Sequence, residues 1–327
     1  MTRPISAPFA CLLAALVTAA VCATAAGAEN WPNRAVHFII PFPAGGASDG
    51  MGRVLAHALG ERLGQQIVIE NRTGAAGAIG AGVVANAEPD GYTFLIATSS
   101  THAVIPVLDA KLGYDPIKNF TPVGMVGSAP NLLVASPTLP VNSVGELIAY
   151  VKARPGEMFY ASSGTGAITH VIAELLKLET GIEITHVPYR GGVQAAPDVT
   201  SGRIAYLFDS IIWTLPLVRG GQLKGLGMAG LKRSPLAPDI PTVAETVPGF
   251  EGVTWFGVFG PAGVATDIVA RLNREIAVVL QSEDTIRRYA ALGVEPAASS
   301  PEELTAFMKK DMAKWADVIK RAGIKLP

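Results

Sequence analysis

The sequence predicts an α/β protein of two lobes, and three patterns in its 327 residues support this. Apolar segments of strand length alternate with segments of helical periodicity, first in residues 36–97 and again in residues 143–228. An extended stretch, Pro122–Ala135, separates the two series, and a glycine-rich strand, Val253–Phe259, follows the second. Such alternation is typical of parallel sheets with crossover helices, so each series predicts one lobe.

The first series begins with a buried strand, Val36–Ile40, which ends at Pro41. Gly45-Gly46 then predicts a tight loop, and Ser48 or Asp49 stands where a helix N-cap is expected. The elements that follow are a helix from Met51 to Leu63 closed by Gly64, a strand Ile67–Ile69, a helix start between Gly74 and Ala85, and a strand Tyr92–Ala97.

The second series follows Pro122–Ala135, whose glycines, prolines and β-branched residues favour a strand that crosses between the lobes. Its elements are a helix Ser143–Ala153 with a Ser143/Glu146 capping box, a strand Met158–Ser162, a helix Ile168–Leu178, and strands Ile184–Val187, Ile204–Phe208 and Leu223–Met228. Val253–Phe259 and helices Thr266–Leu280, Glu283–Ala291 and Pro301–Ala322 complete the chain. We assign residues 29–127 and 230–327 to lobe 1 and residues 128–229 to an inserted lobe 2.

The composition excludes several classes of protein. The 26 Lys and Arg residues balance 27 Asp and Glu residues, which argues against a nucleic-acid partner, because proteins that bind nucleic acids normally carry a basic excess. Apolar residues make up 49% of the chain and fall in periodic runs, so an intrinsically disordered chain is excluded as well.

The N-terminal segment has the pattern of a cleaved signal peptide, residues 1–28. Arg3 precedes an uncharged run, residues 9–26, and small residues at 26–28 form a cleavage site. An uncleaved membrane anchor is the alternative, but Ala and Thr dominate the second half of the run. Both cysteines lie in this segment, so the exported chain needs no disulfide and has no thiol chemistry.

Two glycine-containing loops, one in each lobe, are candidates for an anion site. Each follows a strand and opens a helix, where free backbone amides and the helix dipole favour a negative charge. No lysine follows the first loop, so it is not a phosphate loop, and an ordinary glycine turn is its alternative. As a pair, the loops predict a carboxylate held between the lobes. The candidate residues are Phe42, Ala44, Gly45, Gly46, Ala47, Ser48 and Asp49 in lobe 1, and Ser162, Ser163, Gly164, Thr165 and Gly166 in lobe 2.

A third polar segment follows the strand Tyr92–Ala97. It consists of Ser99, Ser100, Thr101 and His102, and it lies at the sheet edge where ligands of open α/β sheets bind. Its hydroxyls suit polar recognition. Capping of a helix is the alternative role for these residues.

Asp209, Tyr189 and Arg190 also stand at strand ends. Asp209 is predicted to face the cleft, because a buried carboxylate needs a partner. It can accept a hydrogen bond from a ligand amine or hydroxyl, or orient Arg190. Arg190 itself can bind a second carboxylate, and a structural ion pair is the alternative.

The sequence contains no convincing catalytic or metal-binding arrangement. It lacks the G-x-S-x-G nucleophile elbow. His170 and Glu174 share a helix face, but a pair without a third ligand favours a solvated ion pair over a metal site. We therefore expect no catalytic residue, no cofactor and no metal. An exported hydrolase or lyase is the alternative, and Asp209 and His102 are its only plausible acid–base residues.

An exported two-lobed α/β protein with a cleft has the organisation of a type II periplasmic-binding-protein-like, or Venus-flytrap, fold. In such a fold two crossing strands form the hinge, and the lobes close on a ligand.

The order of several motifs resembles the substrate-binding receptors of tripartite tricarboxylate transporters, also called Bug- or TctC-type receptors. The similarity runs from Trp31 to the C-terminus in a fixed order. The motifs are Trp31-Pro32, Pro41–Gly46 with Asp49, Glu70-Asn71-Arg72, Gly74-Ala75-Ala76-Gly77, Pro89–Tyr92, Tyr160–Gly164, His186–Gly191, and Pro241–Glu245 followed by Pro248–Phe250.

This resemblance implies a monomeric receptor in the periplasm that delivers a small carboxylate to a two-subunit inner-membrane permease. The ligand is an organic acid, an aromatic acid or an acidic amino acid. In such receptors the carboxylate sits on the loops matching Phe42–Asp49, Ser99–His102 and Ser162–Gly166, and the acid matching Asp209 contacts the amine of some ligands. A receptor that feeds a membrane sensor kinase is the alternative. Ala196-Pro197 departs from the pattern, which puts a helix there in doubt.

Overall fold

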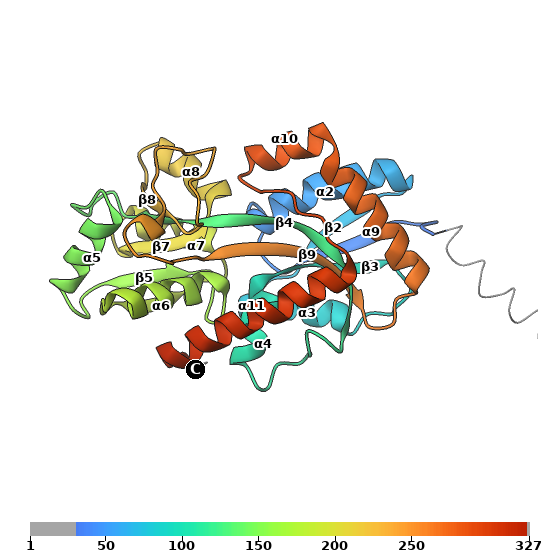
Figure 1. Ribbon diagram of the computed structural model, residues 1–327, viewed down its shortest axis with the longest axis horizontal. Coiled ribbons are helices and arrows are strands. Elements are labelled where there is room, and N and C mark those ends of the chain that lie inside the picture. Colours follow the sequence, from blue (N-terminus) through green and yellow to red (C-terminus); the bar gives the residue numbers. More distant parts are fainter. Residues whose placement is uncertain (1–30, 326–327) are drawn as a thin grey trace, which may run out of the picture.

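The structure is a computed structural model that describes residues 31–325 (Figure 1). The expected signal peptide, residues 1–28, lies outside the described residues. Within residues 31–325, no helix combines the length and the apolar character that a membrane span requires.

Two mixed sheets, one in each lobe, share β4 and so form a continuous order of strands, β2-β1-β3-β9-β4-β7-β5-β6, with β8 also paired to β4 (Figure 1). In lobe 1, β1 pairs in parallel with β2 and β3, as the strand–helix alternation predicts, and β9 is antiparallel to β3. In lobe 2, β5 pairs in parallel with β6 and β7. The strands are β1 (Val36–Ile40), β2 (Ile67–Asn71), β3 (Thr93–Thr98), β4 (Phe120–Ala135), β5 (Phe159–Ser162), β6 (Thr185–Pro188), β7 (Tyr206–Ser210), β8 (Lys224–Met228) and β9 (Val253–Pro261).

Strands β4 and β9 cross from one lobe to the other and connect the two sheets. The first part of β4, up to Pro130, pairs antiparallel with β9, whereas Asn131–Ala135 pair with β7 and β8. At the crossover the buried Asn131 amide donates to the Gly252 carbonyl at 2.9 Å and to Thr254 Oγ1 at 3.1 Å. The predicted pair of crossing strands is therefore confirmed.

Helices cover both sheets (Figure 1). Lobe 1 carries α2 (Ala47–Leu63), α3 (Ala78–Ala85), α4 (Ile105–Leu108), α9 (Thr266–Gln281) and α10 (Glu283–Ala291), and lobe 2 carries α5 (Val144–Lys152), α6 (Ile168–Thr180), α7 (Gly192–Thr200) and α8 (Ile211–Arg219). Short turns form η1 (Ala75–Gly77), η2 (Ser100–Val104) and η3 (Val243–Glu245). The long α11 (Pro301–Ala322) packs on β4 and on α6, so it spans both lobes.

Two helices of lobe 2 differ from the sequence expectations. The sequence does not predict α8, which contains Pro216. Ser210 caps this helix by accepting a hydrogen bond from the Ile212 amide, and the Ile211 and Leu215 side chains are buried. Helix α7 forms in spite of Pro197. Burial of apolar side chains therefore outweighs the cost of a proline in each of these helices.

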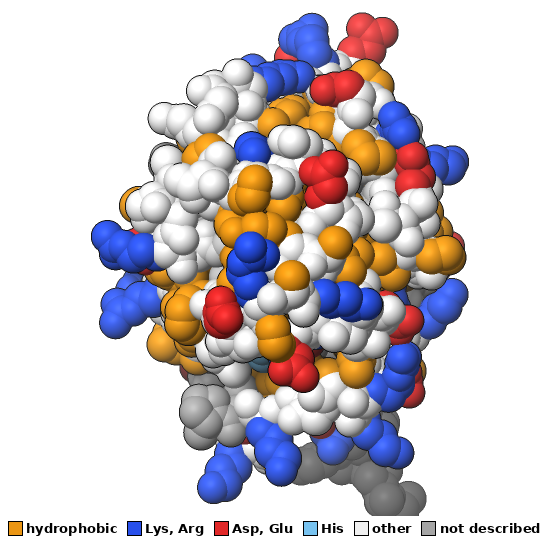
Figure 2. Space-filling model, turned by 90° about the vertical axis from the view of Figure 1, so that its left-hand side faces the viewer, with side chains coloured by type: hydrophobic (Ala, Val, Ile, Leu, Met, Phe, Trp, Pro, Cys, Tyr) orange, Lys and Arg blue, Asp and Glu red, His pale blue; other side chains and the backbone are white. Residues whose placement is uncertain are grey.

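The end of lobe 2 carries lysine, arginine, aspartate and glutamate side chains interspersed with small apolar areas (Figure 2). This mixture of signs agrees with the balanced charge of the sequence.

Candidate functional site

A cavity lies between the two lobes. The volume of this cavity is ≈ 60 Å³, which is enough for several water molecules. Lobe 1 contributes Phe42, Pro43, Gly46, Ala47, Ser48, Thr98 and Ser100; lobe 2 contributes Ser163, Ile168, Thr169, Gly191, Gly192, Val193, Gln194, Asp209, Ser210 and Trp213; the crossing strands contribute Asn131, Thr254 and Phe256.

Helices α2 and α7 begin at this cavity, one from each lobe. Their N-cap residues are Gly46 and Gly191, and neither helix has a side-chain cap. The amides of the first turns therefore have no side-chain acceptor, and the helix dipoles add positive potential at the same place. This corrects the expectation that Ser48 or Asp49 caps α2, because both residues already lie inside the helix.

Asp49 holds the first loop in place and does not line the cavity. Its Oδ2 accepts from the Gly45 amide at 3.0 Å, and its Oδ1 accepts from Asn71 Nδ2 at 3.1 Å and pairs with Arg53 at 2.9 Å. Burial alone raises the pKa of Asp49, but Arg53 and these hydrogen bonds outweigh burial and lower it. The ionised carboxylate thus fixes the backbone that presents the α2 amides. Ala44 and Gly45 are exposed and are not in the cavity lining.

The second loop contributes Ser163 to the cavity, and Thr169 holds it. The Ser163 amide donates to Thr169 Oγ1 at 2.9 Å, and the two hydroxyls lie 2.7 Å apart. The Ile168 amide, at the start of α6, donates to Ser100 Oγ at 2.9 Å. A hydroxyl of lobe 1 therefore caps a helix of lobe 2, and this bond ties the lobes together in the structure.

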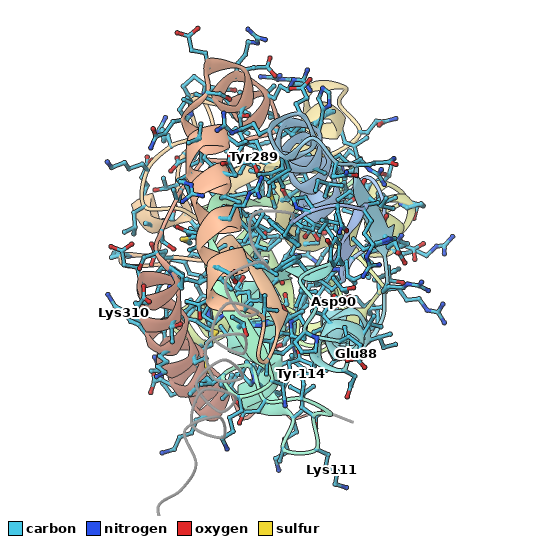
Figure 3. All side chains as sticks on the ribbon, turned by 90° about the vertical axis from the view of Figure 1, so that its right-hand side faces the viewer. Glu88, Asp90, Lys111, Tyr114, Tyr289 and Lys310 are labelled. Carbon is cyan, nitrogen blue, oxygen red and sulfur yellow. The ribbon has the colours of Figure 1, made fainter. Side chains whose placement is uncertain are left out.

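Ser99, Thr101 and His102, the remaining residues of the third polar segment, are not in the cavity lining. Thr101 Oγ1 accepts from the Thr98 amide at 3.0 Å, and Ser99 is buried outside the cavity lining. His102 is buried among aromatic rings, with the Phe259 ring centroid at 4.3 Å and the Tyr114 centroid at 6.3 Å. Figure 3 shows Tyr114 within lobe 1.

His102 and Asp209 are not brought together at the cavity. Burial lowers the pKa of His102 to about 3, so its ring is neutral, and it is not among the residues that line the cavity. The acid–base pair on which the hydrolase alternative depends is therefore absent from the described lining of this cavity.

Two histidines, the buried His170 and the half-buried His186, hold the two ends of the second loop. His186 Nε2 lies 2.6 Å from Ser162 Oγ, and His170 Nδ1 accepts from the Gly166 amide at 3.2 Å. The two imidazole rings stack with centroids 4.0 Å apart. Burial lowers the pKa of His170 to about 4 and that of His186 to about 3, so both rings are neutral at pH 7.

The expected solvated ion pair between His170 and Glu174 is wrong. Both residues are buried, and Glu174 accepts hydrogen bonds from the Tyr160 hydroxyl and, at 2.8 Å, from Lys177. Within residues 31–325, no group of three or more His, Cys, Asp or Glu side chains is placed to hold a metal ion.

Among the described residues that line the cavity, Asp209 carries the only carboxylate. Its Oδ1 accepts from Trp213 Nε1 at 2.9 Å and from the Ser210 amide at 2.7 Å, whereas its Oδ2 is closed to solvent and has no partner in the described chain. Burial raises the pKa of Asp209 to about 6, in spite of these two hydrogen bonds. A Cβ atom at Gly192 would lie 1.8 Å from Oδ2, so only glycine leaves room for this carboxylate.

The structure adds polar cavity residues that the sequence did not single out: Asn131, Thr169, Gln194, Ser210, Trp213 and Thr254. For two of these residues the sequence contained a signal that could have identified them: Asn131 interrupts an apolar strand, and Trp213 stands four residues after Asp209. Gly164, Thr165, Tyr189 and Arg190 lie in a separate groove between the lobes.

Two α/β lobes that share two crossing strands and enclose a cavity with several convergent polar groups have the organisation of a solute-binding protein. Comparison with known families matches residues 51–324 to the tripartite tricarboxylate transporter family receptor. The chain belongs to this family, which confirms the resemblance seen in the sequence motifs.

The relatives agree with this assignment over nearly the whole chain. Protein BugT of Bordetella pertussis is 37% identical over 301 residues, which cover 91% of this chain and 92% of BugT. The R. palustris protein Rpa4515, solved with adipate, is 40% identical with a TM-score of 0.88, covering 90% of this chain and 99% of that one. MatC from Rhodopseudomonas palustris, solved with bound malate, is 33% identical with a TM-score of 0.83, covering 88% and 100%.

A methyl group at Gly192 is expected to destabilise the protein. In Gly192→Ala the new Cβ overlaps Asp209 Oδ2 and lies 3.1 Å from the Trp213 ring, so one of the two side chains must move. We expect the free energy of unfolding in urea to fall by about 1–3 kcal/mol. Gly145→Ala in α5 is the control: its nearest neighbour is 3.9 Å away, so it should gain up to about 1 kcal/mol. Equal stability of the two variants would contradict this placement of Asp209.

Acid should destabilise the protein through its buried histidines. The folded-state pKa of His170 is depressed, so the unfolded chain binds more protons, and stability is lost as pH falls from about 6.5 towards 4. The contribution of His170 over this window is on the order of 3 kcal/mol. Urea unfolding at pH 7, 5.5 and 4 should show a shallower loss for His170→Asn than for the wild type. His57→Asn, at an exposed histidine, should keep the wild-type slope; a wild-type slope in both variants would overturn this prediction.

Proposed function

We propose that the protein is a periplasmic receptor that captures a small carboxylate between its lobes and delivers it to a two-subunit inner-membrane permease. One observation carries this proposal: helices α2 and α7, one from each lobe, begin at the same cavity without side-chain caps. A carboxylate has oxygens on both sides of its carbon, so it can accept hydrogen bonds from both helix starts at once.

The chemistry of the lining supports reversible capture. No lysine or arginine is among the described residues that line the cavity, so amides and hydroxyls, such as those of Ser48, Ser100 and Ser163, face the ligand. Such donors stabilise an anion without a fixed positive charge. The relatives solved with adipate and with malate are bound to carboxylates, which supports the same ligand class here.

Asp209 supplies a second recognition element. Asp209 lines the cavity, and its Oδ2, which is closed to solvent, has no hydrogen-bond partner within residues 31–325. We propose that Asp209 Oδ2 accepts a hydrogen bond from the ammonium or hydroxyl group of the ligand. This bond would supply the partner that Oδ2 lacks among the described residues. An acidic amino acid or a hydroxy acid carries both required groups.

The location and organisation complete the proposal. We propose that cleavage after Ala28 releases the chain into the periplasm as a monomer, and that residues 29–127 move relative to residues 128–229 on opening. Residues 230–252, which the sequence assigned to lobe 1, pack on lobe 2 instead: the Met228 amide donates to the Pro241 carbonyl at 2.8 Å, and the Phe250 ring stacks on Phe208. The passage of β4 from one sheet to the other at Pro130 and Asn131 supports a boundary close to residue 128.

Thermal unfolding of the purified protein against a panel of carboxylates tests the receptor function. The panel includes mono-, di- and tricarboxylates, aromatic acids and acidic amino acids. A ligand at one hundred times its dissociation constant should add about 2.7 kcal/mol to the stability, which raises the Tm by several degrees. Recovery of the bound compound unchanged is expected. If no carboxylate raises the Tm, or if a bound compound is consumed, the receptor proposal fails.

Asp209→Asn tests the recognition of the second group. Calorimetry with aspartate and with succinate gives the ratio of the two affinities, and at pH 8 this ratio should fall about ten-fold in the variant. The wild-type affinity for aspartate should also decrease from pH 7 to pH 5, because Asp209, with a pKa of about 6, becomes neutral. An unchanged ratio would show that Asp209 does not contact the ligand amine.

A further inference from the structure

A second space between the lobes adjoins the cavity at Ser163, which lines both. This groove has a volume of ≈ 360 Å³, so it is much larger than the cavity. Lobe 1 contributes Gly74, Ala75, Ala76, Ala78, Ile105 and Asp109, and lobe 2 contributes Ser163, Gly164, Thr165, Tyr189 and Arg190.

Arg190 is the cationic residue among the described residues that line the groove, and no hydrogen-bonding or acidic group within residues 31–325 pairs with it. It is exposed and makes no hydrogen bond, ion pair or ring contact within residues 31–325. The adjacent Tyr189 is paired: its hydroxyl donates to Asp198 at 2.6 Å, and Asp198 also binds Arg203 at 2.9 Å. The structural ion pair that the sequence left open is therefore not formed.

The acid in the groove does not neutralise this guanidinium. Asp109 Oδ1 accepts from the backbone amide of Lys111 at 2.8 Å, and no ion pair joins Asp109 to Arg190. Figure 3 shows the Lys111 side chain extending outward from this loop. Arg190 is left with donors in a fork geometry that matches a carboxylate.

The opposite wall has an uncommon backbone conformation. Ala75 and Ala76 have φ values of 47° and 52°, in the left-handed region that alanine rarely adopts. Ala76 faces the other lobe, since its amide nitrogen lies 3.6 Å from the position of a Cβ at Gly164. Strained backbone of this kind concentrates at ligand sites, and tight turns often form concave surfaces that attract anions.

We propose that this groove binds a second carboxylate of the ligand and that Arg190 is the residue that binds it. The first carboxylate lies at the starts of α2 and α7, the chain of the ligand passes Ser163, and the far carboxylate meets the guanidinium. A dicarboxylate, the class to which the adipate and malate of the solved relatives belong, supplies both groups. This inference rests on the proposed function, because it assumes that the first carboxylate occupies the cavity.

Calorimetry with matched ligand pairs tests the inference. The ligands are unbranched dicarboxylates from succinate to suberate, each paired with the monocarboxylate of the same chain length. The proteins are the wild type, Arg190→Gln and Arg274→Gln. Arg274 is the matched control, because it is also exposed and without a partner within residues 31–325, but it lies on α9 outside both spaces.

In Arg190→Gln we expect the best dicarboxylate to lose about ten-fold or more in affinity, while its monocarboxylate partner changes less than about two-fold. Arg274→Gln should change neither affinity. Equal losses for both ligands, or no loss in Arg190→Gln, would overturn the groove assignment and leave the carboxylate receptor intact. Failure of every carboxylate to bind the wild type would instead overturn the proposed function itself. Unaltered melting curves of both variants without ligand would confirm that folding is unaffected.

Discussion

The central physical constraint of this molecule is the pair of uncapped helix starts that meet at one cavity. Helices α2 and α7 begin at Gly46 and Gly191, which line the cavity, and neither N-cap offers a side-chain acceptor to the amides of the first turn. Buried donors of this kind are costly unless something accepts from them. Asp49 holds the loop that precedes α2 by accepting a hydrogen bond from the Gly45 amide. At the start of α7, the absence of a side chain at Gly192 leaves room for Asp209.

The crossing strands explain how two lobes can share such a site. Because β4 pairs with β9 in one lobe and with β7 and β8 in the other, both sheets have a common backbone at the cavity floor. Ser100 adds a contact across the cleft by capping α6 of the other lobe. The site is therefore complete only when the lobes are together, which is the requirement for a receptor that closes on its ligand.

Burial controls the charges around the cavity. The stacked His170 and His186 are neutral and serve as hydrogen-bonding supports for the second loop. The second carboxylate oxygen of Asp209 has no hydrogen-bond partner in the part of the chain that the structure describes. The positive potential comes from helix starts, and the guanidinium of Arg190 lies outside the cavity in the adjoining groove.

The sequence by itself determined the order of the strands and of most helices, the crossing strand, the loops that open α2 and α6, and the family, because periodicity, glycine placement and motif order are local properties of the chain. Only the tertiary structure decided that Gly46 is the N-cap of α2, that Asp49 supports its loop, and that Arg190 has no partner within residues 31–325. It also brought Asn131 and Trp213 to the cavity and formed α8 around Pro216. These outcomes depend on contacts between residues far apart in the chain, and spacing along a sequence carries no information about such contacts until the sheets and helices are packed.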